Sequence, residues 1–106
     1  MIIEHIDKMT KGWFIGNFVP SVFVTEAFEV GFKIHKAGEK YGFHYHQLVK
    51  EINLLVEGEM KMHKKNLKSG DIFILEPFEI ADPEFLTDCK IICVKVPGIA
   101  QDKIDI

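Results

Sequence analysis

Two histidines and one glutamate lie close together near the middle of this sequence, with a glycine on each side. His44 and His46 are two residues apart, Glu51 follows them, and Gly38 and Gly58 flank the stretch. Side chains two residues apart on a β-strand point to the same face. Two imidazoles and a carboxylate suit a first-row transition metal that keeps open coordination positions. The pattern therefore predicts a small β-barrel with a divalent metal (Fe, Mn, Ni, Co or Zn) at its mouth.

Length and composition set the size and class of the protein. The chain has 106 residues, of which 47% are hydrophobic and 27% charged. This length is enough for one domain with a single core, so we expect one domain over residues 1–106. Nine phenylalanines favour a β-rich core, because aromatic residues fit a pleated, half-buried surface. A net charge of −3 leaves no basic stripe for phosphates, so no nucleic-acid partner is expected.

The sequence also predicts a cytoplasmic protein that does not enter a membrane. No apolar run approaches the roughly 20 residues that cross a bilayer, and residues 1–5 lack the pattern of a secretory signal. On a strand, Cys89 and Cys93 would be about 13 Å apart, whereas a disulfide needs Cα atoms within about 7 Å. Both cysteines are therefore expected to act as small buried hydrophobic residues.

Turn-forming residues interrupt the chain roughly every 8 to 12 residues, the spacing of an all-β sandwich or barrel. The expected strands cover residues 12–19, 26–34, 43–46, 51–56, 60–64, 72–75, 78–81 and 90–96, and no helix is expected. This spacing fits an antiparallel barrel or jelly roll and equally an immunoglobulin-like sandwich. The histidine cluster favours the barrel.

Alternation along residues 26–34 assigns two faces to one expected strand. Phe28, Val30, Phe32 and Ile34 fall on one face, and His35 falls on the opposite, polar face. We therefore expect His35 to lie at the surface or at a subunit contact.

The spacing between the histidines and the glutamate imposes a condition on the chain between them. His44 and His46 have the same strand parity, but Glu51 has the other parity. Glu51 can face the same cavity only if residues 47–50 form a turn or irregular connection that resets the register. Asn53 follows Glu51 by two residues, so it should face that cavity too.

The full pattern, G-(x)5-H-x-H-(x)4-E-(x)6-G, resembles the first signature motif of the cupins and matches it at every fixed position. The resemblance implies a double-stranded β-helix, a jelly-roll-like antiparallel barrel, with its core at about residues 12–97. The alternative interpretation is that two unrelated imidazoles lie on a solvent-exposed face.

The second cupin motif is only partly present. Gly70 and Asp71 open it, but Pro77 falls one residue late and Glu79 occupies an expected glycine position. Asp82 stands where the resemblance implies a third histidine.

Asp82 is therefore a candidate fourth metal ligand, with Glu79 or Glu76 as substitutes if the register slips. The alternative is that Asp82 caps the turn it forms with Pro83.

Three residues are candidates for ligand binding. Asn53 should look into the cavity, Tyr41 could overhang the barrel mouth, and Glu79 lies in the second motif. The expected function is a metal-dependent enzyme acting on a small polar metabolite, such as a sugar, sugar nucleotide or oxo acid. A non-catalytic module that binds a small molecule or metal is the alternative, and the degraded second motif favours it. A purely structural barrel is a third possibility.

Two expected strands also predict a homodimer. Residues 72–75 and 91–92 are apolar on both strand faces, and one barrel interior can cover only one of them. The resemblance points the same way, since cupins commonly form dimers.

Overall fold

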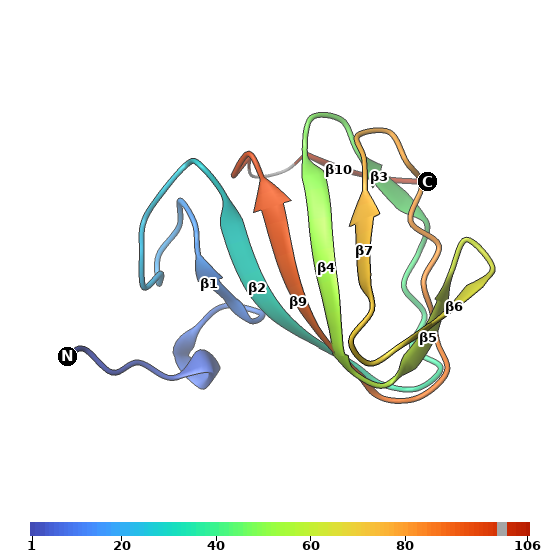
Figure 1. Ribbon diagram of the computed structural model, residues 1–106. Helices are drawn as coiled ribbons and strands as arrows, with labels where there is room; N and C mark the ends of the chain where they lie inside the picture. The colour runs from blue at the N-terminus through green and yellow to red at the C-terminus, as the bar shows by residue number, and fades with distance from the viewer. Residues whose placement is uncertain (100–101) are drawn as a thin grey trace.

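The computed structural model describes residues 1–99 and 102–106 and contains three antiparallel sheets (Figure 1). The largest sheet has the strand order β1-β2-β9-β4-β7. Its strands are β1 (Trp13–Ile15), β2 (Glu29–His35), β9 (Cys89–Val96), β4 (Lys50–Glu57) and β7 (Ile72–Leu75). Apart from β1 and β2, neighbouring strands of this sheet are not consecutive in the sequence, as in a jelly roll.

Two smaller sheets complete the barrel. One has the order β6-β5-β8, and the other pairs β10 with β3. Their strands are β5 (Glu59–Met62), β6 (Lys65–Lys68), β8 (Glu84–Phe85), β3 (His44–His46) and β10 (Lys103–Asp105). The expected all-β, double-stranded β-helix architecture is confirmed. The one helical element described is a short 3-10 turn, η1 (Ile6–Lys8), and no helix in residues 1–99 and 102–106 is long and apolar enough to span a membrane.

The strand boundaries differ from the expected ones in the second half of the chain. A strand was expected over 60–64 and none over 65–71, but β6 occupies 65–68 and the hairpin turn lies at His63 and Lys64. Both turn residues have positive φ, 51° and 62°, as a tight two-residue hairpin requires. Expected strand 78–81 is reduced to one bridge between Ala81 and His44. A β-strand near the C-terminus, β10, pairs with β3.

The assignment of faces on β2 is the main error of the sequence analysis. His35 is 9% exposed and faces the barrel interior, whereas Ile34 is 58% exposed. Glu29, Gly31 and Lys33 share the inward face of β2 with His35, since residues two apart on a strand share a face. Because the interior contains a polar cavity, the polar face of this strand turns inward.

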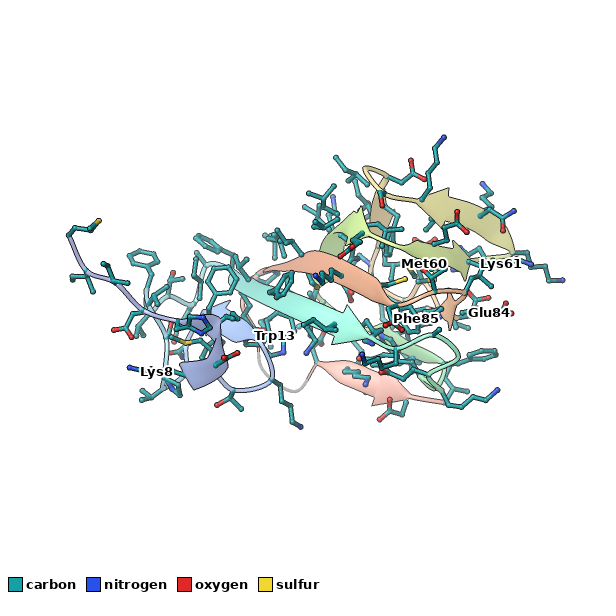
Figure 2. All side chains as sticks on the ribbon, turned by 90° about the horizontal axis from the view of Figure 1, so that it is seen from below. Lys8, Trp13, Met60, Lys61, Glu84 and Phe85 are labelled. Atoms are coloured by element: carbon teal, nitrogen blue, oxygen red, sulfur yellow. The ribbon has the colours of Figure 1, made fainter. Side chains whose placement is uncertain are left out.

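The apolar core fills the part of the barrel between the large sheet and the β5–β8 pair. Leu55 of β4 and Cys89 of β9 are fully buried, and Met60 and Phe85 are cross-strand partners on β5 and β8. Figure 2 shows Met60 and Phe85 together, well separated from Trp13. Cys89 and Cys93 are both buried free thiols, as expected.

The two glycines that flank the first motif are required for different structural reasons. Gly58 has φ +110°, and a Cβ there would overlap the Asp88 carbonyl oxygen and the Cys89 sulfur. Gly38 has φ +75°, but a Cβ added to it would meet no other atom within 4 Å. Gly58 is thus fixed by both conformation and space, and Gly38 by conformation alone.

Alanine substitutions should separate these two reasons. Gly38→Ala should lower the free energy of unfolding by about 1–2 kcal/mol, the strain of a left-handed residue. Gly58→Ala should lower it further, because backbone and a buried sulfur must also move. Urea unfolding followed by circular dichroism measures both. Equal losses of unfolding free energy in the two variants would contradict the role assigned to the close approach of Asp88 and Cys89 to Gly58.

Candidate metal and ligand site

Strand β3 places both histidines inside the barrel. His44 and His46 are each 5% exposed. The strand is held on one side by β10 and on the other by the bridge to Ala81. The shared inward direction of the two imidazoles is the one that their spacing predicted.

Residues 47–49 form the irregular connection that Glu51 requires. A carboxylate from the C-terminal segment holds it: Asp102 Oδ2 accepts hydrogen bonds from the backbone amides of Leu48 and Val49, each at 3.0 Å. Asp102 is 8% exposed and Val49 is 1% exposed, so the buried amides find their partner there. With the register reset, Glu51 faces the two histidines.

His44, His46 and Glu51 converge, and we call them the His-Glu cluster. Each offers one ligand atom within 4.8 Å of the others, so the cluster could hold a metal ion. His46 Nε2 lies 3.0 Å from Glu51 Oε2, so these two side chains could hold one divalent ion together.

The surroundings of His44 favour metal binding through its Nε2 atom, and those of His46 do so only in part. His44 Nδ1 donates to the Gly42 carbonyl at 3.3 Å, which leaves the Nε2 lone pair of the neutral ring free. His46 Nδ1 lies 3.9 Å from Asp102 Oδ2 and has no hydrogen-bond partner among the described residues. A hydrogen bond from the second ring nitrogen to an oxygen is the usual arrangement around a histidine that binds a metal; His44 makes this bond, whereas Asp102 lies too far from His46 Nδ1 to complete it.

Burial and neighbouring charges set the protonation states of the cluster. Burial lowers the pKa of His44 below its ordinary value, which favours the neutral ring. Burial alone would raise the pKa of Glu51, but the hydrogen bond with His46 and the charge of Lys95 lower it overall. A neutral imidazole and a charged carboxylate are the forms that ligate a metal.

The His-Glu cluster opens into a cavity of about 70 Å³ in the barrel interior. Asn53 lines it, is 3% exposed, and has no hydrogen-bond partner for Nδ2 among the described residues. Tyr41 also lines it and packs edge-on against His44, with ring centroids 5.3 Å apart. The other polar or aromatic residues in the lining are Trp13, Lys33, His35, Phe73, Phe85, Cys93, Lys95 and Lys103.

Known structures share this architecture. No family model and no curated protein matches the sequence. A protein with a double-stranded β-helix domain from Klebsiella pneumoniae superposes with a TM-score of 0.70 at 22% identity, covering 76% of this chain and 71% of that one. A cupin-2 domain protein from Shewanella frigidimarina gives 0.56 at 16% identity, covering 68% and 72%. The chain has a cupin fold.

An enzyme is also among the similar structures. The DMSP lyase DddQ from Ruegeria pomeroyi has a TM-score of 0.72 at 16% identity, over 87% of this chain. The chain spans 48% of that lyase, so the likeness concerns the cupin barrel alone.

The structure does not bring the residues of the partial second cupin motif to the cluster. Asp82 Oδ1 accepts a hydrogen bond from the backbone amide of His63 at 2.8 Å, which supports the β5–β6 hairpin turn. Glu79 Oε1 accepts from the Glu76 amide at 3.0 Å, and Glu76 Oε1 lies 3.4 Å from Lys50 Nζ. None of the three acids lines the cavity of the His-Glu cluster in the described structure.

Sequence reasoning missed several residues around the cupin cavity. His35 stacks on Phe85, with ring centroids 4.2 Å apart, and its Nδ1 lies 2.6 Å from Glu39 Oε2. Lys33 and Lys95 line the cavity from β2 and β9. Once Glu51 is assigned to the interior, strand pairing predicts that Lys95 faces it. Asp102 lies 51 residues beyond Glu51, and no spacing pattern connects the two.

Asp102 should be required for a well-formed cluster. Asp102→Ala should lower the free energy of unfolding by about 1–3 kcal/mol, because the buried Val49 amide loses its partner. It should also weaken metal binding, since residues 47–49 orient Glu51. Chemical unfolding and metal titration measure the two effects. Asp105→Ala is the matched control, because the Asp105 side chain on β10 is 77% exposed; equal behaviour of both variants would refute the assignment.

Proposed function

We propose that this cupin binds a divalent transition metal through His44, His46 and Glu51 and acts as a metal-dependent enzyme on a small polar metabolite. The observation that carries the proposal is the convergence on a cavity of N and O ligand atoms from two buried histidines and the half-buried Glu51. Such a mixed ligand set leaves the identity of the metal open among Fe, Mn, Ni, Co and Zn. Two buried free cysteines support a cytoplasmic location.

The residues around the cluster could bind, orient and protonate a substrate. A divalent ion, when bound, polarises a carbonyl or hydroxyl group or lowers the pKa of a bound water. Tyr41, Lys33 and His35 line the same cavity and are groups that can hold or move a proton. Asn53 can donate a hydrogen bond to a substrate oxygen.

A non-catalytic binding module is the second candidate, and one observation favours it. Glu51 is the only carboxylate among the described residues that line the cavity, and it belongs to the His-Glu cluster. Glu76 and Glu79, the substitute ligands named in the sequence analysis, make their contacts outside the cavity. A general base would therefore have to be a residue other than a carboxylate.

Metal content provides the first test. Protein purified without a nickel column should contain a transition metal, and His44→Ala should lose it. His63→Ala should keep it, because His63 lies at the β5–β6 hairpin turn, outside the cluster.

Dialysis at pH 5 without chelator should release the ion, since protons compete for the imidazoles below about pH 6. The lowered pKa of His44 shifts this loss toward lower pH. Full metal content at pH 5, or in His44→Ala, would contradict the proposed site.

Turnover then separates the enzyme from the binding module. Thermal-shift screening with sugars, sugar nucleotides and oxo acids identifies molecules that bind. Conversion of a binding molecule that stops in His44→Ala supports the enzyme. A thermal shift without conversion supports the module.

We further propose that the outer face of the large sheet forms a homodimer interface. Two cross-strand rows on this face are wholly apolar: Phe32, Ile92, Leu54 and Ile72, and next to them Val30, Val94, Ile52 and Ile74. Ile72 and Ile74 are 67% and 50% exposed. Monomeric proteins rarely leave such a contiguous apolar face in water, and a two-fold dimer would pair the face with itself.

A charge on this face should dissociate the dimer. Ile72→Glu should give a monomer by light scattering at micromolar concentration, because a carboxylate would be buried without a partner. Ile80→Glu should leave the mass unchanged, since Ile80 is 46% exposed but lies outside the large sheet. A monomeric mass for the unaltered protein would overturn the proposal.

A further inference from the structure

Three lysines surround the cavity that contains the His-Glu cluster. Lys33 comes from β2, Lys95 from β9 and Lys103 from β10, and all three line it. Against these three ammonium groups, the described lining contains one carboxylate, Glu51. The whole chain has a net charge of −3, so the excess of ammonium groups in this lining has the opposite sign to the net charge of the protein.

Two of the lysines are arranged around one aromatic ring. Lys33 Nζ lies 5.1 Å and Lys95 Nζ 4.7 Å from the centroid of Trp13. Gly31 makes room for this ring, because a Cβ at Gly31 would collide with the indole. The third lysine, Lys103, lies 4.8 Å from the ring centroid of Tyr41. Aromatic faces stabilise ammonium groups by an electrostatic attraction, and here they fix their positions at the cavity.

The protein neutralises these charges incompletely. Lys33 Nζ donates to the Lys11 carbonyl at 2.8 Å, which satisfies one of its three N–H groups. Lys95 is paired in register with Glu29 and Glu51, but Glu51 also contacts His46. Asn53 Nδ2 adds a buried donor without a partner among the described residues. The cavity therefore offers more hydrogen-bond donors than acceptors.

We propose that the ligand of this cavity is a small carboxylic acid, held at its carboxylate by Lys33 and Lys95. A second oxygen of the same molecule, a hydroxyl or oxo group, faces the His-Glu cluster; this part rests on the proposed metal-dependent function. Charge-assisted hydrogen bonds to ammonium groups are the strong kind, and a positive cavity concentrates anions. A cavity of about 70 Å³ holds a few water-sized groups, which favours a short hydroxy or oxo acid over a sugar nucleotide.

Glycerate and glycerol provide matched probes, because they differ by a carboxylate in place of a hydroxymethyl group. Calorimetry on the protein as purified should show glycerate binding at least about tenfold tighter than glycerol. Lys33→Met and Lys95→Met should each remove about tenfold of glycerate affinity, since each loses one ammonium contact. Lys68→Met should change nothing, because Lys68 is an exposed residue of β6. Equal affinities for the two probes, or unchanged glycerate affinity in both cavity variants, would overturn the proposal.

Three further measurements distinguish this proposal from failure of the metal site, from a folding defect and from a phosphate ligand. Metal content should be the same in Lys33→Met and in the unaltered protein, so failure of the anion site and failure of the metal site give different results. Lys33→Arg should restore most of the glycerate affinity lost in Lys33→Met, which a mere folding defect would not do. Inorganic phosphate that binds while glycerate does not would refute a carboxylate ligand and assign the lysines to a phosphate.

Discussion

The hydrogen bonds from Leu48 and Val49 to the Asp102 carboxylate are the interaction on which the rest of the site depends. Strand geometry alone would turn Glu51 away from His46, because their separation has odd parity. The held connection at residues 47–49 changes that parity and joins a carboxylate to two imidazoles. Burial would raise the pKa of Asp102, yet amide donors from Leu48 and Val49 lower it overall. The carboxylate therefore remains charged, the form in which it accepts several amide hydrogen bonds.

A polar interior has consequences for the outside of the barrel. Strand β2 directs His35 inward and leaves Ile34 58% exposed, and apolar side chains also face outward on β9, β4 and β7. Cys93, Asn53 and Phe73 face the interior, and the residues directly before and after each of them along the strand form the apolar rows on the outer face. The cavity and the outer apolar face are therefore two sides of one sheet. A barrel that dedicates part of its interior to ligands has to cover its remaining apolar surface elsewhere, and association of two copies would do so.

The sequence predicted local features well and features set by distant contacts poorly. Strand parity, a local property, was sufficient to put His44 with His46 on one face and Glu51 with Asn53 on one face. The register reset that brings the two pairs into one cavity depends on the distant Asp102 carboxylate. The inward face of β2 was assigned wrongly, since polarity indicates burial only when the interior is apolar. Asp82 was a candidate ligand by position in a motif, but its carboxylate binds the His63 amide. The role of Asp102 depends on β10 pairing with β3, and no periodicity in the sequence reports such a contact.

The charges inside the barrel connect the His-Glu cluster with the lysines. An ammonium group removed from water is unfavourable unless a partner compensates it, and burial indeed lowers the pKa of Lys33. Glu51 cannot fully neutralise the charge of Lys95 while its carboxylate also contacts His46 at 3.0 Å. A divalent ion at the cluster would add positive charge to the same cavity, which increases the attraction for an anion. An ion and the lysines would therefore select the same kind of ligand: one whose negative end faces β2 and β9 while another oxygen faces β3 and β4.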